Sequence, residues 1–122
     1  MQGAQAVRKL TIYYNPKCSK SRATLALLKE HGADPQVIDY LETPPTAAEL
    51  RGLVARLGIA PEDLVRKGEE VFKTKYAGRE LTDEQWIAAM VADPILIERP
   101  IVVAGDEAEI GRPPERVERL LR

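Results

Sequence analysis

A strand pattern, a helix pattern and a second strand pattern follow one another early in the chain, and this order limits the possible folds more than any other feature. Residues 10–14 (LTIYY) combine aromatic and β-branched side chains, which favour an extended strand. Residues 19–30 have the spacing of an amphipathic helix, and residues 36–41 (QVIDYL) again indicate a strand. This arrangement predicts a βαβ unit with parallel strands and a right-handed crossover.

The predicted helix at residues 19–30 has a clear end and one apolar stripe. His31-Gly32 marks its C-terminus, so we interpret His31 as a helix-end residue rather than a catalytic one. The residues whose spacing predicts burial are Ala23, Leu25, Ala26 and Leu28.

The middle of the chain has no convincing strand pattern. Thr46 and Glu49 have the spacing of a capping box, ahead of a helix that Gly58 closes. Three further short helices are predicted, over residues 61–65, 70–76 and 82–91. We therefore expect an all-helical insertion over about residues 46–93.

The C-terminal part of the chain returns to strand patterns. Residues 100–104 (PIVVA) and 108–110 are joined through Gly105-Asp106, which predicts a β-hairpin. A final helix is expected from Pro113-Pro114, with Val117, Leu120 and Leu121 on one face. The order of βαβ, helices and ββα predicts an α/β protein with a thioredoxin-like fold and an all-helical insertion between the two halves. We expect one domain over residues 9–122, after a mobile tail at residues 1–8.

Charge and composition exclude several classes of function. The chain has 18 basic and 19 acidic residues, so its overall charge does not favour nucleic-acid binding. It contains no apolar run long enough to cross a bilayer and no signal-peptide core, so we expect a cytoplasmic protein without a membrane partner. Because it has one histidine and one cysteine, no metal-ligand motif is apparent.

The single cysteine, Cys18, stands at the junction between the first predicted strand and the helix. The N–H groups and the dipole at a helix N-terminus favour negative charge, so this thiol should ionise more readily than a free one. Lys17, Lys20 and Arg22 add positive charge nearby. The pattern therefore indicates a reactive thiolate rather than a small buried hydrophobic residue. Without a second cysteine, an internal disulfide is excluded.

Four short motifs resemble the glutaredoxin-dependent arsenate reductase family, in the same order and with similar spacing. They are NPKCSKSR at residues 15–22, the pair Arg66-Lys67, ERPIVV at residues 98–103, and GRP at residues 111–113. The resemblance runs from about Leu10 to the end of the chain. The continuation Ser-Lys-Ser-Arg after the cysteine and the ending Gly-Arg-Pro-Pro-Glu are most similar to a reductase-like subfamily whose substrate is not established.

The resemblance implies a role for individual residues. Cys18 would be the nucleophile, and the Arg99-Pro100 peptide would be cis. The arginines implied to hold the oxyanion are Arg66, Arg99 and Arg112. Guanidinium groups bind such anions in bidentate geometry and lower the pKa of a nearby thiol, so the chemistry of these residue types agrees. Supporting positions are implied for Asn15, Ser21, Arg22 and Pro100.

The resemblance also implies an oxidoreductase activity. A Cys18 thiolate would attack arsenate, and electrons from glutathione and a glutaredoxin would lead to arsenite. Ser21 stands where a dithiol protein keeps its resolving cysteine, so the reducing thiol must come from outside. No bound cofactor is expected, glutathione would be a co-substrate, and the protein is expected to be a monomer.

Three alternatives to this prediction differ in what they require of the sequence. Phosphatase-like arsenate reductases place an arginine six residues after the cysteine, and Thr24 occupies that position here. A general glutathione-dependent thiol oxidoreductase would need the Cys-x-x-Ser turn and the cis-proline but not three converging arginines. A regulator resembling the Spx proteins would bind RNA polymerase without turnover, although many of those carry a Cys-x-x-Cys switch that this chain lacks.

Overall fold

The computed structural model describes residues 9–121, so the mobile tail expected at residues 1–8 lies outside the described residues. The strands are β1 (Leu10–Tyr14), β2 (Gln36–Asp39), β3 (Ile101–Ala104) and β4 (Glu107–Ile110). The α-helices are α1 (Ser19–Glu30), α2 (Ala47–Leu57), α3 (Glu70–Lys75) and α4 (Asp83–Ala92). The 3₁₀ helices are η1 (Pro61–Leu64), η2 (Pro94–Leu96) and η3 (Pro114–Leu121). The bounds of β1 and α1 coincide with the predicted ones.

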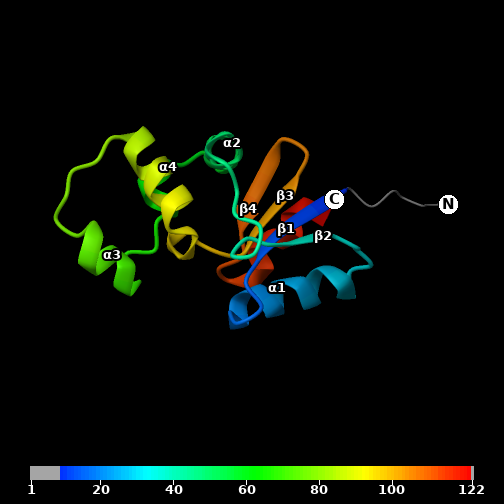
Figure 1. The fold of residues 1–122 in the computed structure, drawn as a ribbon. Helices are drawn as coiled ribbons and strands as arrows, with labels where there is room; N and C mark the ends of the chain where they lie inside the picture. The colour runs from blue at the N-terminus through cyan, green and yellow to red at the C-terminus, as the bar shows by residue number, and fades with distance from the viewer. Residues whose placement is uncertain (1–8, 122) are drawn as a thin grey trace. The chain divides into compact units, whose positions relative to one another are not determined.

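The strands form one four-stranded sheet in the order β2-β1-β3-β4 (Figure 1). β1 and β2 are parallel, as the βαβ prediction requires, and Ile12 pairs with Val37. β1 and β3 are antiparallel, as are β3 and β4. The predicted hairpin is therefore confirmed, and its turn uses Gly105 at a φ of 62°, a backbone conformation that glycine adopts without steric cost.

One face of the sheet is covered by α1 and η3. Leu10 and Ile12 of β1 lie opposite Ala104 and Val102 of β3, so these four side chains point to the same face. They form a buried cluster with Leu28 of α1 and with Val117 and Leu120 of η3. This apolar layer fixes α1 against the sheet, and with it the loop between β1 and α1.

The buried face of α1 differs from the predicted stripe. Its buried residues are Ser21, Thr24 and Leu28, whereas Ala23 and Ala26 are exposed. The spacing is still that of one helix face, but the first turns present small polar side chains to the interior. Burial of Ser21 is compatible with stability because its hydroxyl oxygen accepts a hydrogen bond from the backbone N–H of Asn15 at 3.3 Å.

Two other elements differ from their predictions. β2 ends at Asp39 rather than residue 41; beyond it, Tyr40 is fully buried and Leu41 is 39% exposed. The final helix has the expected buried residues Val117 and Leu120, but η3 is a 3₁₀ helix throughout.

The chain divides into two compact units. The sheet unit consists of residues 9–39 and 99–121, and the helical unit is Tyr40–Glu98. The helical unit contains the expected insertion of about residues 46–93, extended by several residues at each end. The prediction of one domain over residues 9–122 stays a prediction.

The helical unit is organised around α4. In this unit α4 contacts α2, η1 and η2, and Trp86, Ile87 and Met90 on α4 are buried. The rings of Phe72 and Trp86 stack with their centroids 6.1 Å apart. Capping boxes begin both long helices: the expected one pairs Thr46 with Glu49, and another pairs Thr82 with Gln85. Among the described residues, no helix is long and apolar enough to cross a membrane.

Candidate active site

Cys18 occupies the N-cap position of α1, with an extended backbone at φ −97° and ψ 122°. Its backbone N–H donates to the carbonyl oxygen of Asn15 at 2.9 Å, which closes a turn between β1 and α1. The residue is half-buried. The sulfur is therefore presented at the start of a helix, where negative charge is favoured.

Asn15 holds the turn that carries the cysteine. It is 4% exposed, and its side-chain oxygen accepts from the backbone N–H of Lys17 at 2.9 Å. With the bonds to Cys18 and Ser21, three contacts of one buried asparagine fix the loop to the helix that follows it. The Arg22 guanidinium donates to the carbonyl oxygen of Pro16 at 2.8 Å, so Arg22 supports the same loop from outside.

Two arginines from the C-terminal segment of the sheet unit contact the sulfur. The Arg112 Nη2 lies 3.5 Å from the Cys18 Sγ, although the two residues are 94 positions apart in the sequence. The Arg99 side chain, which is 8% exposed, also hydrogen-bonds to the Cys18 sulfur. In addition, the Arg112 Nε donates to the backbone oxygen of Arg99 at 2.8 Å, so one arginine helps to position the other.

Hydrogen bonds to the sulfur change the ionisation of the thiol. Partial burial raises the pKa of Cys18, but hydrogen bonds to the sulfur outweigh it and lower the pKa from 9.0 to about 7. The donors are the backbone N–H and hydroxyl of Ser21, the Arg99 side chain and the backbone N–H of Lys20. Lys20 thus acts through its amide rather than its ammonium group. Donors at the helix start, together with the Arg99 side chain, lower the pKa of Cys18, which the sequence attributed partly to Lys17, Lys20 and Arg22.

Both arginines at the thiol precede a cis peptide bond. The Arg99-Pro100 peptide is cis, as the resemblance implies, and the Arg112-Pro113 peptide is also cis. Gly111 packs against Thr24 and Pro100: a Cβ at this position would stand 2.5 Å from the Thr24 Oγ1 and 3.0 Å from the Pro100 Cγ. Residue 111 therefore has no room for a side chain, because the chain ahead of Arg112 passes directly over α1 and Pro100.

Arg66 belongs to the helical unit and has two acidic partners there. Its Nε donates to the Glu69 Oε2 at 3.0 Å, and its Nη1 donates to the Glu98 Oε1 at 2.8 Å. Burial lowers the pKa of Arg66, but the two carboxylates outweigh that effect and raise it. Cys18, Arg99 and Arg112 thus meet within the sheet unit, whereas the described contacts of the Arg66 guanidinium are with carboxylates.

The sequence did not point to four residues that lie next to Arg66 or next to the segment that carries Arg112. Glu69 and Glu98 were not singled out as partners of Arg66, and Thr24 was considered only as the wrong residue for a phosphatase-type loop. The GRP motif alone gave no physical reason for a glycine at position 111. A glycine next to an X-Pro pair was the one available signal, since such a glycine often marks a close approach of two chain segments.

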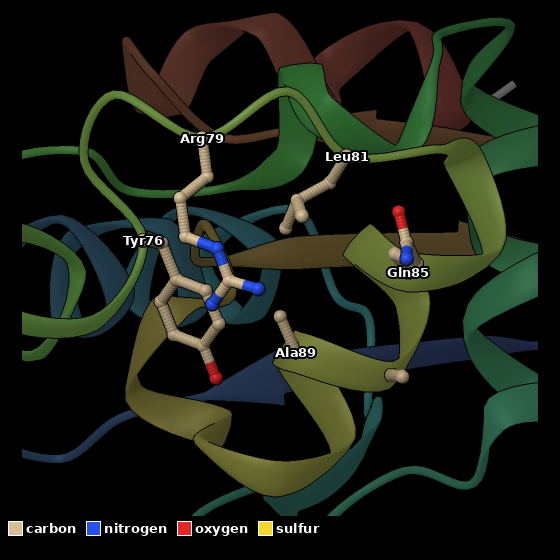
Figure 2. Close-up of a pocket in the computed structure, with 6 residues that line it drawn as sticks. Tyr76, Arg79, Leu81, Gln85 and Ala89 are labelled. Carbon is tan, nitrogen blue, oxygen red and sulfur yellow. The ribbon is translucent and has the colours of Figure 1, made fainter.

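A pocket with a volume of about 250 Å³ lies within the helical unit, away from the residues around Cys18 named above (Figure 2). Its lining residues are Tyr76, Arg79, Leu81, Gln85, Ala88 and Ala89. The Tyr76 hydroxyl already donates to Asp93 at 2.8 Å, and the Arg79 Nη1 donates to the Lys75 carbonyl at 3.2 Å. The lining holds no thiol or other strong nucleophile, so the candidate active site remains at Cys18.

Metal chemistry finds no support in the described part of the chain. No group of three histidine, cysteine, aspartate or glutamate side chains there could hold a metal ion. His31 follows α1 as its C-cap residue, and its Nδ1 lies 3.0 Å from the Leu27 carbonyl oxygen. This agrees with its interpretation as a helix-end residue.

Comparison with known proteins gives consistent results. Residues 13–120 match the model of the ArsC family. The chain is 52% identical to the uncharacterized protein YfgD of Escherichia coli strain K12, over 90% of this chain and 94% of that protein. It is 43% identical to an arsenate reductase of the same strain, over 92% of this chain and 80% of that protein. The structure of an arsenate reductase from Vibrio cholerae matches with a TM-score of 0.91 and 48% identity, covering 95% of this chain and all of that one. The predicted thioredoxin-like α/β fold class is thereby confirmed.

Proposed function

The chain belongs to the ArsC family, and on this basis we propose that it is an arsenate reductase that uses Cys18 as its only redox thiol. The observation that carries the proposal is the contact between the Cys18 sulfur and two arginines, with the Arg112 Nη2 at 3.5 Å. A thiol with a pKa of about 7 is substantially ionised at neutral pH. Guanidinium groups beside it supply the charge that an oxyanion requires.

The reaction begins with the Cys18 thiolate. It attacks the arsenic atom of a bound arsenate, an As–S bond forms, and one arsenate oxygen leaves as water after protonation. Arg99 and Arg112 offset the negative charge on the remaining oxygens, in the manner of donors preorganised around a developing anion. Arg66 is assigned to the same oxyanion, as the family resemblance implies.

Reduction then needs an external thiol, because Ser21 cannot act as a resolving residue. A glutathione thiolate attacks the Cys18 sulfur, and the electron pair of the As–S bond goes to arsenic, which leaves as arsenite in the +3 state. Cys18 and glutathione are joined as a mixed disulfide. A glutaredoxin takes the glutathione and returns Cys18 to the thiolate, so two external thiols are oxidised for each arsenate reduced.

The arginine contacts favour this function over a general thiol oxidoreductase. A protein that exchanges disulfides needs a low-pKa thiol and an accessible sulfur, but it does not need two guanidinium groups at that sulfur. The same contacts also favour an enzyme over a regulator resembling the Spx proteins. A pull-down with RNA polymerase tests the regulatory alternative directly.

The decisive experiment is a coupled assay. The purified protein is supplied with arsenate, glutathione, a glutaredoxin, glutathione reductase and NADPH, and NADPH consumption is followed at several arsenate concentrations. We expect arsenate-dependent consumption that requires both glutathione and the glutaredoxin. Turnover of disulfide substrates without any arsenate dependence would instead support the general thiol oxidoreductase. The cytoplasmic location and the monomeric state stay predictions.

A further inference from the structure

Three basic side chains flank Cys18 on the loop and the first turns of the helix that carry it. Lys17 precedes the cysteine, and Lys20 and Arg22 lie near the start of α1; we call these three residues the basic rim. All three are exposed, and the basic rim lies entirely within the sheet unit. Its charges therefore face solvent next to the residue that is proposed as the nucleophile.

The charge of the basic rim is not balanced by acidic side chains. Among residues 9–121, the described contacts of the basic rim include no carboxylate. The Arg22 guanidinium donates to the Pro16 carbonyl oxygen at 2.8 Å, and a neutral carbonyl leaves its positive charge in place. The sequence from Leu10 to Lys29 contains no aspartate or glutamate. A net positive charge therefore remains beside Cys18.

Basic residues are unfavourable at this end of a helix. The helix dipole places partial positive charge at the N-terminus, so acidic residues in the first turn stabilise a helix and basic ones destabilise it. α2, α3 and α4 follow this rule, with Glu49, Glu70 and Asp83 in their first turns. α1 has no acidic residue in its first turn and has Lys20 there instead. A local rule that is broken in this way indicates a functional requirement.

Neither thiol ionisation nor the oxyanion accounts for the basic rim. The groups that lower the pKa of Cys18 are Ser21, the Arg99 side chain and the backbone N–H of Lys20. Arg99 and Arg112 already contact the sulfur, where the oxyanion is proposed to bind. The exposed charges of the basic rim lie along the loop and the helix surface. They therefore suit a longer anionic ligand whose own sulfur must reach Cys18.

We propose that the basic rim recognises the carboxylates of the external thiol reductant, so that Cys18 exchanges thiols fastest with anionic peptide thiols of the glutathione class. The inference deepens the proposed function and rests on it, because that function makes Cys18 the thiol that meets an external reductant. Glutathione carries two carboxylates and one ammonium group at neutral pH, so its net charge is negative. An unbalanced cationic surface raises the local concentration and the encounter rate of such a ligand.

Two disulfides test this charge preference directly. Glutathione disulfide has a net negative charge, and hydroxyethyl disulfide is neutral. In both reactions the Cys18 thiolate attacks one sulfur, the S–S bond breaks, and the other half leaves as a thiolate. Intact-protein mass spectrometry at constant pH and ionic strength gives the two rate constants, and their ratio cancels any change in the thiolate fraction of Cys18. The variants are Lys17→Gln, Lys20→Gln, the double variant of both, and a triple variant that adds Arg22→Gln.

Each single variant should lower the preference for glutathione disulfide by about two-fold, the double variant by about three- to four-fold and the triple variant by about five- to ten-fold. The double variant retains Arg22 and its contact with Pro16, so this support of the loop is kept. Rising ionic strength should weaken the preference of the unmodified protein more than that of the triple variant.

Lys29→Gln is the matched control, because it removes the same charge from the last turn of the same helix. Lys29 lies about 15 Å along the helix axis from the start of α1, which exceeds the Debye length of about 10 Å at 0.1 M salt. This variant should therefore keep the preference within about 1.5-fold of the unmodified protein.

The proposal is overturned if the double and triple variants also keep the preference within about 1.5-fold. It is overturned as well if Lys29→Gln lowers the preference as much as Lys17→Gln, because overall charge would then be responsible. If neither disulfide modifies Cys18, the thiol does not meet external thiols and the inference fails.

None of these reactions contains arsenate, so the coupled assay tests the reductase function separately. Arsenate turnover together with an unchanged preference means that only this inference fails. A preference that is lost in the triple variant, in a protein that does not turn over arsenate, supports the role of the basic rim and refutes the reductase function.

Discussion

Arg112, at the thiol, and Arg66, in the helical unit, have different electrostatic surroundings. In the sheet unit, Arg112 donates to a backbone carbonyl and lies 3.5 Å from the Cys18 sulfur. In the helical unit, Arg66 donates to the carboxylates of Glu69 and Glu98. A carbonyl positions a guanidinium without cancelling its charge, whereas two carboxylates position it and cancel that charge. Arg112 is therefore placed to stabilise the thiolate, whereas the described partners of Arg66 balance its charge within the helical unit.

The largest expected effect comes from removing the one nucleophile. Cys18→Ser should abolish arsenate-dependent NADPH consumption, because a hydroxyl is a far poorer nucleophile than a thiolate at neutral pH. Intact-protein mass spectrometry after incubation with arsenate and glutathione should show a glutathione adduct on the unmodified protein and none on the variant. Activity that persists in the serine variant would mean that Cys18 is structural, and the comparison of arginines would then lose its functional meaning.

The second effect contrasts the two arginines directly. Arg112→Ala should lower kcat/KM for arsenate by roughly 10²- to 10³-fold, the usual result of losing one preorganised donor. It should also raise the pH midpoint of Cys18 alkylation, since a positive charge near the sulfur is lost. Arg66→Ala should leave that midpoint unchanged, because its described partners are carboxylates. Equal pH midpoints of Cys18 alkylation in Arg112→Ala and Arg66→Ala would show that the two arginines do not differ in their effect on the thiol.

A third prediction concerns the ionisation of the thiol itself. The rate of Cys18 alkylation should rise with pH through a midpoint of about 7 and level off above it, because the folded protein holds the thiolate at a pH where a free thiol is still protonated. Ser21→Ala should move the midpoint upward by removing one donor, while Ser19→Ala, at an exposed position one residue after the cysteine, should not. A midpoint at or above about 8.5 in the unmodified protein contradicts the prediction.

The smallest effect should be on stability, at the close approach that places Arg112. Gly111→Ala should lower the free energy of unfolding by about 1–3 kcal/mol, because its Cβ would stand 2.5 Å from the Thr24 Oγ1 and 3.0 Å from the Pro100 Cγ. Gly68→Ala is the control, since a Cβ there meets nothing within 4 Å. Urea denaturation measures both variants, and equal midpoints would show that the chain ahead of Arg112 can move aside.

Several local features followed from the sequence because they depend on neighbouring residues. The bounds of β1 and α1, the capping box at Thr46 and the turn at Gly105 rest on side-chain periodicity, on a three-residue capping spacing and on the freedom of glycine. The position of Cys18 at the start of α1 also follows from such local patterns. By contrast, the apolar pattern placed Ala23 and Ala26 in the interior, where the structure has Ser21 and Thr24.

The sequence by itself determined the order of the elements, the location of the only thiol and, through its motifs, the family of proteins that the chain resembles. The tertiary structure decided which charges surround each arginine and why residue 111 is glycine. Arg112 reaches Cys18 across 94 positions, and Arg66 reaches Glu98 across 32. The physical reason is that short-range spacing controls helix ends and turns, whereas ion pairing and close packing depend on which distant segments the folded sheet and the helical unit bring together.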